Sequence, residues 1–419
     1  MRKIVLFSLF ICSILFTQST FALLSMELTR GVAGAIPIAV VPFSVEGMPP
    51  QNVSAIIAND LKNSGRFKVQ ANKQGVDNIV VGQIQQTSPN HYEVSFKLLD
   101  AFKSKGAGEQ SAAISKKFEV SGDQLRQLSH HISDLVYQQI LGVRGVFSTR
   151  LAYILVQHLQ GAPTRYVLEV CDQDGYAPRP LLTSTDPIMS PSWSPNGKQI
   201  AYVSFENKRA GIYIQDVGNG SRRLLSQFPG INGAPAWSPD GRKLALVLSK
   251  GGTPNIYIMN MASHQLTQIT NDFYINTEPS WSPNGKSLVF TSNRGGHYPQ
   301  IYQINLTNKA VTRVTYEGNY NARASFTPDG NHIVVLNRNS DTFNIGILDL
   351  DAGTFRVLTN SGVDSESPSS APNGSMVLYG TLSGGRNVLG MSATDGSVQI
   401  LLPARQGEVQ DPAWSPFLS

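Results

Sequence analysis

The chain has 419 residues, and its 34 basic and 29 acidic side chains leave a formal net charge of only +5. Its basic residues are scattered along the sequence, which argues against the clustered positive surface typical of nucleic-acid-binding proteins. Two cysteines are too few for a disulfide framework, and the length leaves room for two domains with large apolar cores.

The first 22 residues have the pattern of a secretory signal peptide. Arg2 and Lys3 precede an apolar run at 4–16 that is too short to span a bilayer, and Ala22 supplies a small residue before a cleavage point. We therefore expect an exported, soluble mature chain that begins at Leu23 and carries a net charge of +3.

Neither cysteine predicts a special role. Cys12 follows Phe10 and Ile11, which are too bulky for a lipid-attachment box, so a lipoprotein anchor is not expected. Cys171 lies in the strand-like run 167–171, where a lone thiol is more often a small buried hydrophobe than a nucleophile.

A small mixed domain is predicted at 36–144, behind an N-terminal arm at 23–35 that has no evident partner strand. Two segments with apolar residues at helical spacing, 53–61 and 125–140, alternate with runs rich in β-branched and aromatic residues. The predicted strands lie at 36–43, 67–70, 78–84, 92–99 and 113–120. This alternation predicts an α/β domain. Whether the arm at 23–35 is docked or free stays open.

From residue 145 onward the sequence repeats a motif of the form Pro-Ser-Trp-Ser-Pro-Asn-Gly, in which Pro and Gly favour a tight turn. The third position of the motif recurs at steps of 44, 44, 45, 44 and 44 residues, and further strand-like runs follow the copies. Four short strands per ~44 residues is the period of a β-propeller blade. The residues at the third position are Trp193, Trp237, Trp281, Phe326, Ser370 and Trp414.

The two ends of the repeat region are incomplete in complementary ways. Residues 150–182 hold three strand-like runs without the tryptophan strand, and 412–416 hold that strand alone. The sequence thus predicts a six-bladed β-propeller over 145–419 that is closed by its own last strand, which pairs the exposed sheet edges. The tryptophans are expected to pack between blades.

No catalytic set is evident, so we expect neither enzymatic activity nor a bound metal or cofactor. The Gly-x-Ser-x-Gly pattern of a nucleophile elbow is absent. His130 and His131 are adjacent on a predicted helix and point about 100° apart, so they are expected at the edge of a helix face and do not form a metal pair.

An enzyme remains the alternative, as a propeller lyase or hydrolase that acts on envelope glycan or peptide. Glu278, Glu366 and Asp411 could converge in the central channel of a propeller. Two carboxylates about 5.5 Å apart would favour that alternative, since retaining glycosidases use such a pair.

The loops that join one blade to the next all open on one face of a propeller. In this chain they mix amide, hydroxyl, carboxylate and apolar groups, which suits recognition of a polypeptide loop, although loops that serve only as connectors fit the same pattern. Glycan binding would need exposed aromatic side chains, and Tyr274 and Tyr320 are the two that qualify.

The ordered motifs resemble those of the TolB family, the periplasmic propeller proteins of the Tol-Pal system of Gram-negative envelopes. The resemblance covers essentially the whole chain, and the order of motifs behind an α/β domain is more specific than any single Trp-Ser-Pro-Asp-Gly, which peptidase propellers share. The motifs are Pro37-Ile38-Ala39-Val40-Val41-Pro42-Phe43, Val80-Val81-Gly82-Gln83, Asp174-Gly175-Tyr176, Met189-Ser190-Pro191, Asn232-Gly233-Ala234-Pro235, Asn276-Thr277-Glu278-Pro279 and Pro412-Ala413-Trp414-Ser415-Pro416.

The resemblance implies a monomeric periplasmic adaptor that supports outer-membrane integrity and constriction at cell division. It implies that the channel mouth binds the peptidoglycan-associated lipoprotein Pal through Met189, Ile231, Asn232, Ala234, Asn276, Thr277, Glu278 and Glu366. It also implies that the inner-membrane-anchored TolA is bound through Leu23, Leu24, Ser25, Met26, Glu27, Leu28, Thr29 and Arg30. The sequence departs from the family at Ile231, where His is frequent, and at the start of the arm, which lacks the usual acidic, strand-like pattern.

Overall fold

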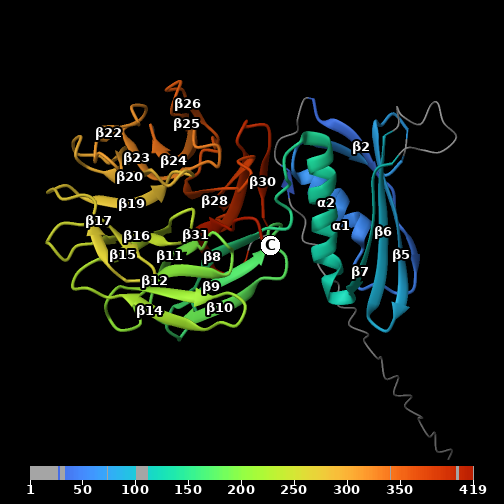
Figure 1. Cartoon of the computed structure of the whole chain (residues 1–419), viewed down its shortest axis with the longest axis horizontal. Helices are drawn as coiled ribbons and strands as arrows, with labels where there is room; N and C mark the ends of the chain where they lie inside the picture. Colours follow the sequence, from blue (N-terminus) through green and yellow to red (C-terminus); the bar gives the residue numbers. More distant parts are fainter. Residues whose placement is uncertain are drawn as a thin grey trace, which may run out of the picture.

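The computed structural model describes residues 27–28, 34–72, 74–100, 112–339, 341–402 and 405–418. The expected signal peptide at 1–22 lies outside these residues, as do positions 23–26 and 29–33 of the arm. The described chain forms a small α/β domain beside a larger propeller (Figure 1). No helix within these ranges has both the length and the apolar character needed to cross a bilayer.

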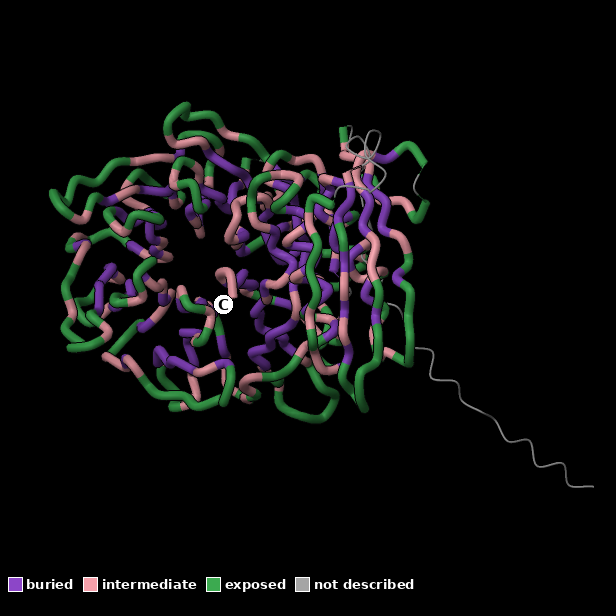
Figure 2. Tube along the Cα trace, turned by 45° about the vertical axis from the view of Figure 1, so that its right-hand side comes forward, coloured by how far each residue is buried: buried purple, intermediate pink, exposed green. Residues whose placement is uncertain are grey.

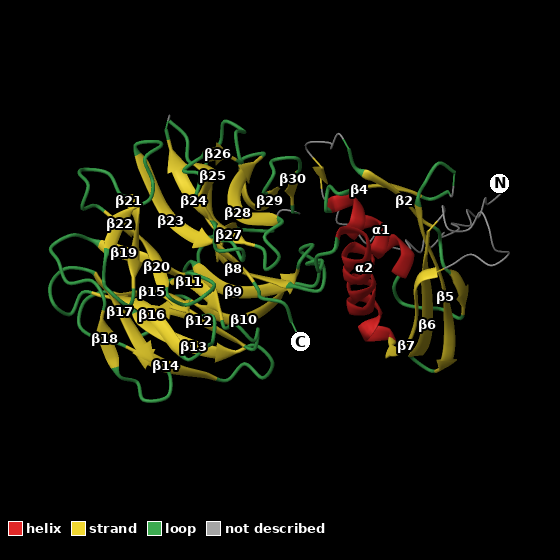
Figure 3. Cartoon of the chain, turned by 45° about the horizontal axis from the view of Figure 1, so that its top comes forward, coloured by secondary structure: helices red, strands yellow, loops and turns green. Residues whose placement is uncertain are grey.

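The α/β domain is a mixed sheet with two helices on one face. Its elements are β2 (Ile36–Val40), β3 (Ser44–Glu46), α1 (Val53–Asn63), β4 (Phe67–Gln70), β5 (Asn78–Ser88), β6 (His91–Asp100), β7 (Ala112–Ser121) and α2 (Leu125–Leu141). The strand order is β4-β2-β5-β6-β7, with β3 beside β5. Ile57, Val94 and Ile132 belong to the core between helices and sheet, and the helices face the propeller (Figure 3).

Local sequence fixes where the helices begin and end. The side chain of Asn52 accepts a hydrogen bond from the backbone N–H of Ala55 at 3.1 Å and so caps α1. Gly142 ends α2 in the left-handed conformation, with φ 78°, which glycine adopts without strain. Asp134 of α2 then accepts the backbone N–H of Phe147 at 2.8 Å, so the helix holds the link that leads into the propeller.

The propeller consists of six antiparallel blades of four strands, and blade 6 gains a fifth from the arm. From its innermost to its outermost strand, blade 1 is β31 (Glu408–Trp414), β8 (Arg150–Gln157), β9 (Arg165–Asp172) and β10 (Arg179–Ser184). In the same direction, blade 2 is β11 (Ile188–Trp193), β12 (Gln199–Ser204), β13 (Gly211–Asp216) and β14 (Arg222–Ser226). Blade 3 is β15 (Asn232–Trp237), β16 (Lys243–Leu248), β17 (Asn255–Asn260) and β18 (Leu266–Gln268).

The other three blades follow the same order around the ring. Blade 4 is β19 (Asn276–Trp281), β20 (Ser287–Ser292), β21 (Gln300–Asn305) and β22 (Val311–Arg313). Blade 5 is β23 (Tyr320–Phe326), β24 (His332–Arg338), β25 (Asn344–Asp349) and β26 (Phe355–Val357). Blade 6 is β27 (Ser365–Ser370), β28 (Met376–Ser383), β29 (Arg386–Ala393) and β30 (Gln399–Leu401). The innermost strands contact one another in sequence, and β27 contacts β31, so the ring is closed.

The closing strand is the one that the sequence predicts. β31 pairs antiparallel with β8, which places Trp414 opposite Leu151. The indole Nε1 of Trp414 donates to Thr149 Oγ1 at 2.8 Å, and its backbone N–H donates to Ser369 Oγ of blade 6 at 2.9 Å. The last strand therefore joins blades 1 and 6 by side-chain as well as backbone contacts.

The motif tryptophans pack between blades, as expected. Trp193 Nε1 donates to the carbonyl of Ala413 in the preceding blade at 3.2 Å, and Trp281 Nε1 donates to that of Ala236 at 3.0 Å. Trp193 and Trp281 are buried, while Trp237 is half-buried. Buried residues lie mainly within the ring and the interior of the α/β domain, and exposed residues lie mainly along the outside of both (Figure 2).

The arm supplies the fifth strand of blade 6. β1 (Glu27–Leu28) pairs antiparallel with β30, with Glu27 opposite Leu401 and Leu28 opposite Ile400. The sequence leaves open whether the arm is docked, and at these two residues its backbone is docked along the edge of a blade.

The α/β domain rests on one end of the ring. In an antiparallel four-stranded blade, the turn after the first strand and the loop after the third strand share one end, and the loops between blades lie at the other. Asn373, in the first turn of blade 6, donates to the carbonyl of Arg144 at 2.9 Å. Arg66 pairs at 2.9 Å with Asp395, which follows β29. The domain thus contacts blade 6 at the end away from the loops between blades.

A second set of contacts joins the domain to blade 1 at the same end. Arg126 of α2 pairs at 3.3 Å with Asp172 and also pairs with Asp174, at the end of β9 and in the loop that follows it. Its guanidinium lies 3.7 Å from the centre of the Tyr176 ring. Blades 1 and 6 are the two that β31 joins, so the α/β domain covers the point of ring closure.

Candidate functional site

The sequence-predicted binding residues of the propeller lie at the starts of the innermost strands. We call this end, where the loops between blades lie, the channel mouth. Met189 lies in β11, Ile231 directly before β15, Asn232 and Ala234 in β15, Asn276, Thr277 and Glu278 in β19, and Glu366 in β27. Four blades therefore bring these residues to the same end of the ring.

These residues differ in how far a partner can reach their side chains. Met189 is 38% exposed and Ile231 is 47% exposed, so both present apolar surface to solvent. Glu366 is also exposed, whereas Ala234 and Thr277 are half-buried. Direct contact by a partner is therefore easiest at Met189, Ile231 and Glu366.

The two predicted asparagines are buried and hold loops in place. Asn232 accepts hydrogen bonds from Ser226 Oγ and from the backbone N–H of Phe228, each at 2.9 Å. Asn276 donates to Asp272 at 2.7 Å and accepts from Arg294 at 2.8 Å. Because both amides are bonded within the protein itself, they position the loops at the channel mouth and do not face a partner.

Each innermost strand carries one residue with a left-handed backbone, at a break in its pairing with the next strand. The six residues are Ser190, Ala234, Glu278, Arg323, Ser367 and Asp411, with φ between 44° and 54°. All six line one central cavity of about 440 Å³. This regular series of β-bulges turns one residue of every blade toward the channel.

Arg323 reaches across that cavity and joins several blades. Its Nε lies 3.2 Å from Glu278 Oε1, and its Nη1 donates to Asp411 Oδ1 at 2.6 Å and to Ser367 Oγ. Its backbone N–H donates to Glu278 Oε2 at 3.0 Å, and the backbone N–H of Ser190 donates to Asp411 Oδ2 at 2.9 Å. The carboxylates of Glu278 and Asp411 are therefore already paired within the ring.

This pairing bears on the enzyme alternative. Glu278 and Asp411 do converge in the channel, but on one guanidinium, and Glu366 lies exposed at the rim. Burial alone would raise the pKa of Asp411, yet Arg323 and hydrogen bonds from Ser190 and Ser367 hold that pKa below its usual range. A glycosidase acid needs a carboxyl whose pKa is raised, so Asp411 has the opposite tuning.

A second cavity, of about 640 Å³, adjoins the first between blades 2 and 3. It brings together Met189, Ile231, Asn232 and Ala234, and it shares Ser190 and Ala234 with the central cavity. The channel mouth therefore holds two adjacent hollows, one central and one beside it.

Exposed apolar side chains continue around the mouth. They are Met189, Ile231, Phe273, Tyr274, Ile275, Tyr298 and Tyr316. Phe273 is 95% exposed, although it lacks the motif spacing that drew attention to its neighbours. Of the two aromatics expected from sequence, Tyr274 is exposed, while Tyr320 is half-buried against Phe343, with ring centres 5.3 Å apart.

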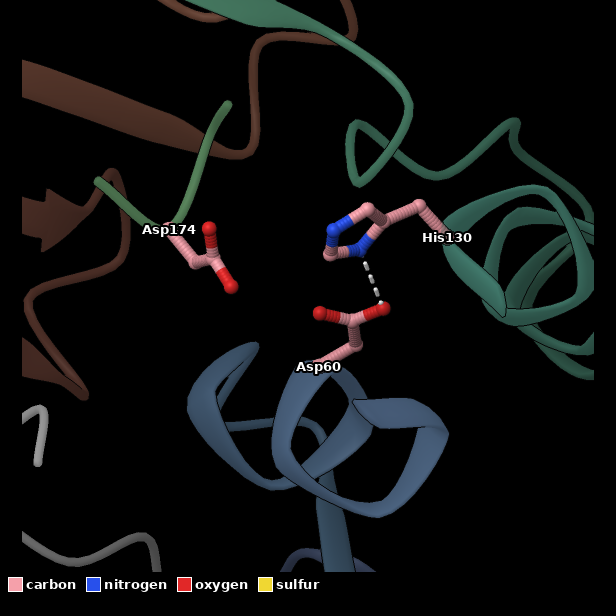
Figure 4. Close-up of side chains that lie close together, drawn as sticks. All are labelled: Asp60, His130 and Asp174. Atoms are coloured by element: carbon pink, nitrogen blue, oxygen red, sulfur yellow. Dashed lines mark hydrogen bonds and ion pairs between the residues drawn. The ribbon is translucent and has the colours of Figure 1, made fainter. Parts of the chain in front are cut away.

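A group of titratable side chains also lies between the two domains, away from the mouth. His130 of α2, Asp60 of α1 and Asp174 of blade 1 each place one atom within 4.8 Å of the others (Figure 4). His130 Nδ1 bonds to Asp60 Oδ2 at 2.8 Å, and Ser133 Oγ donates to the same oxygen at 2.7 Å. Asp174 is paired with Arg126, so both carboxylates already have partners.

The protonation of His130 follows from these neighbours. Burial would lower its pKa, but the charge and hydrogen bond of Asp60, with the charge of Asp174, raise the pKa to about 9. The ring thus carries a positive charge at neutral pH. The expectation that this histidine lies at the edge of a helix face is wrong, because its side chain is buried between α1, α2 and the propeller.

Cys171 agrees with its expected role. The thiol is buried, and burial raises its pKa, so the reactive thiolate is disfavoured.

Two family models match the sequence, the TolB amino-terminal domain over residues 24–74 and the TolB beta propeller domain over residues 137–418. The Tol-Pal system protein TolB of Coxiella burnetii is 55% identical, with 98% of each chain covered. That of Legionella pneumophila strain Corby is 56% identical, with 97% of this chain and 98% of the relative covered. The crystal structure of TolB from Acinetobacter baumannii superposes with a TM-score of 0.85 at 39% identity, covering 94% of this chain and 100% of that one. The chain therefore belongs to the TolB family of the Tol-Pal system.

Proposed function

We propose that the mature chain is a monomeric, non-catalytic adaptor in the periplasm. It binds a Pal-like peptidoglycan-associated lipoprotein at the channel mouth and a TolA-like inner-membrane protein through residues 23–30. Through these two interactions it supports outer-membrane integrity and constriction during cell division. Family membership supports the choice of partners, since the relatives are named for the Tol-Pal system.

One observation carries the choice of face. Exposed apolar side chains gather at the mouth of a closed ring, next to two adjacent hollows, while the α/β domain contacts blades 1 and 6 at the other end. Apolar surface that a soluble protein leaves exposed around a concavity is typical of a protein-binding site. Arg323 is paired with Glu278 and Asp411, which favours a binding surface over a reaction centre in the channel.

Ile231→Asp tests the Pal-like partner. It should weaken binding of the soluble domain of that lipoprotein at least tenfold, about 1.4 kcal/mol, because an apolar contact is replaced by a carboxylate that must be desolvated. Isothermal titration calorimetry measures the affinity, and thermal unfolding should show little change in Tm, since Ile231 is 47% exposed.

Val357→Asp is the matched control for that variant. Val357 is 45% exposed but lies on β26, the outermost strand of blade 5. The affinity of Val357→Asp for the lipoprotein domain should match that of the wild type. Equal losses in both variants, or none in either, would show that the channel mouth is not the binding surface. Glu278 is a poorer probe, because its substitution would also break the pairing with Arg323.

Deletion of residues 23–34 tests the second partner. It should abolish binding of the soluble periplasmic part of the TolA-like protein and leave the lipoprotein affinity unchanged. Blade 6 keeps its four own strands without β1, so the propeller should remain folded, which circular dichroism checks. Loss of both interactions, or of neither, would contradict two separable sites.

A further inference from the structure

The second cavity at the channel mouth has apolar walls. Val203, Phe205 and Ala210 of blade 2 line one side, Pro229 and Ile231 line the other, and Met189 lies between them and the channel. Its volume of about 640 Å³ falls within the ~300–1,000 Å³ range of pockets that enclose small ligands. It is therefore large enough to enclose a large side chain of a bound polypeptide.

The rim of this cavity is positively charged. Lys208 and Arg209 stand at the tip of the hairpin between β12 and β13, both exposed, and neither forms an ion pair within the described residues. The nearest acidic residue in sequence, Glu206, is bound by Arg222 at 2.7 Å. No aspartate or glutamate belongs to the described lining, so the two cations have no charged partner there.

We propose that this cavity anchors the bound polypeptide by a large apolar side chain followed or preceded by an acidic residue. The apolar side chain enters between Phe205 and Ile231, and its acidic neighbour pairs with Lys208 or Arg209. This inference deepens the proposed function and rests on it. The two cations at the rim favour an anionic group on the partner, and the apolar walls favour a hydrophobic one.

The position of the cavity makes a polypeptide the fitting occupant. It shares the lining residues Ser190 and Ala234 with the central cavity, so one bound polypeptide can contact both hollows. The central cavity is lined by Arg323, Glu278 and Asp411, already paired with one another, and it offers polar contacts. The second cavity would then add an apolar anchor beside these polar contacts.

Two variants of the full-length mature chain test this against the soluble lipoprotein domain. Ala210→Trp fills the cavity and should weaken binding at least tenfold. Arg209→Glu reverses one rim charge and should weaken binding about tenfold at 50 mM NaCl, and much less at 500 mM, where exposed charges are screened beyond ~4 Å. Arg223→Glu, an exposed reversal on β14, is the control and should bind as the wild type does.

The outcomes separate this inference from the proposed function. If Ile231→Asp weakens binding while Ala210→Trp and Arg209→Glu do not, the cavity is not an anchor and the proposed function stands. If the wild type does not bind the lipoprotein domain, both are overturned. If Ala210→Trp lowers the Tm, its weaker binding could come from unfolding, and the affinity of Arg209→Glu then decides whether the cavity is an anchor. The affinity that Arg209→Glu loses should be recovered by changing one acidic residue of the lipoprotein domain to Lys. If Arg209→Glu changed the affinity no more than Arg223→Glu does, the proposal would be refuted.

Discussion

A chain that ends at Gly407 is expected to lose the cooperative fold of its propeller. Without β31, blade 1 lacks its innermost strand and β8 becomes an unpaired edge beside blade 6. The truncation also removes Trp414, and loss of one such buried side chain alone costs about 3–5 kcal/mol. It further removes Asp411, which leaves Arg323 without one of its two carboxylates. The total amounts to a large part of the roughly 5–15 kcal/mol that typically stabilises a folded protein.

Circular dichroism during thermal unfolding measures this effect. The truncated chain should unfold over a broad range or not at all, and a peptide spanning residues 408–418 added in excess should restore part of the transition. Trp414→Phe, which keeps the strand and most of the apolar volume, is the control and should unfold cooperatively. A truncated chain with the Tm of the full-length protein would show that closure contributes little.

The second large effect is a loss of stability at alkaline pH that depends on His130. Its folded-state pKa of about 9 exceeds the unfolded value of about 6.5, so protonation favours the folded state. The stabilisation is fully present below pH ~6.5 and disappears as pH rises through about 9. At about 1.4 kcal/mol per pKa unit, it amounts to roughly 3 kcal/mol. Asp60 and Asp174 face the ring, and Arg126 holds Asp174.

Urea unfolding at pH values of about 6.5 and about 9.5 tests this linkage. The wild type should lose free energy of unfolding between the two values, while His130→Gln should be less stable at the lower pH and should lose distinctly less, the remainder coming from groups such as the buried Cys171 thiol, whose pKa is also raised. His131→Gln is the matched control, because His131 lies half-buried against Phe118 and its pKa is lowered by burial. Parallel pH profiles for the wild type and His130→Gln would contradict the assignment.

The propeller could be predicted from sequence because each blade repeats one local pattern. Steps of 44 or 45 residues between motif positions gave the number of blades. A first blade that lacks one strand, together with a single motif strand at the end of the chain, predicted the closing strand. The helices were found equally well, since 53–61 and 125–140 carry a helical period and lie within α1 and α2. These features depend on neighbours along the chain, and such neighbours are visible in a sequence.

The site could be predicted only in part, because side chains from distant blades meet there. Arg323 stands in the same position of its blade as Glu278, at a step of 45 residues, and that register was the available signal. That Arg323 turns across the ring toward Asp411 depends on the closure of the ring. Burial of Asn232 and Asn276, and of His130 beside Asp174, likewise depends on how loops and domains pack.

The meeting of the ring closure with the domain contact has a consequence for the order of assembly. Trp414, which bonds to Thr149 across the closure, lies in the last strand of the chain, so this pairing forms after the other blades have emerged. The α/β domain is complete long before and can hold the end of β9 through Arg126. We therefore expect the three strands β8, β9 and β10 of blade 1 to be held against this domain until the final segment arrives. Closure of the ring should then be the slow phase of folding, since contacts between distant parts of the chain form last.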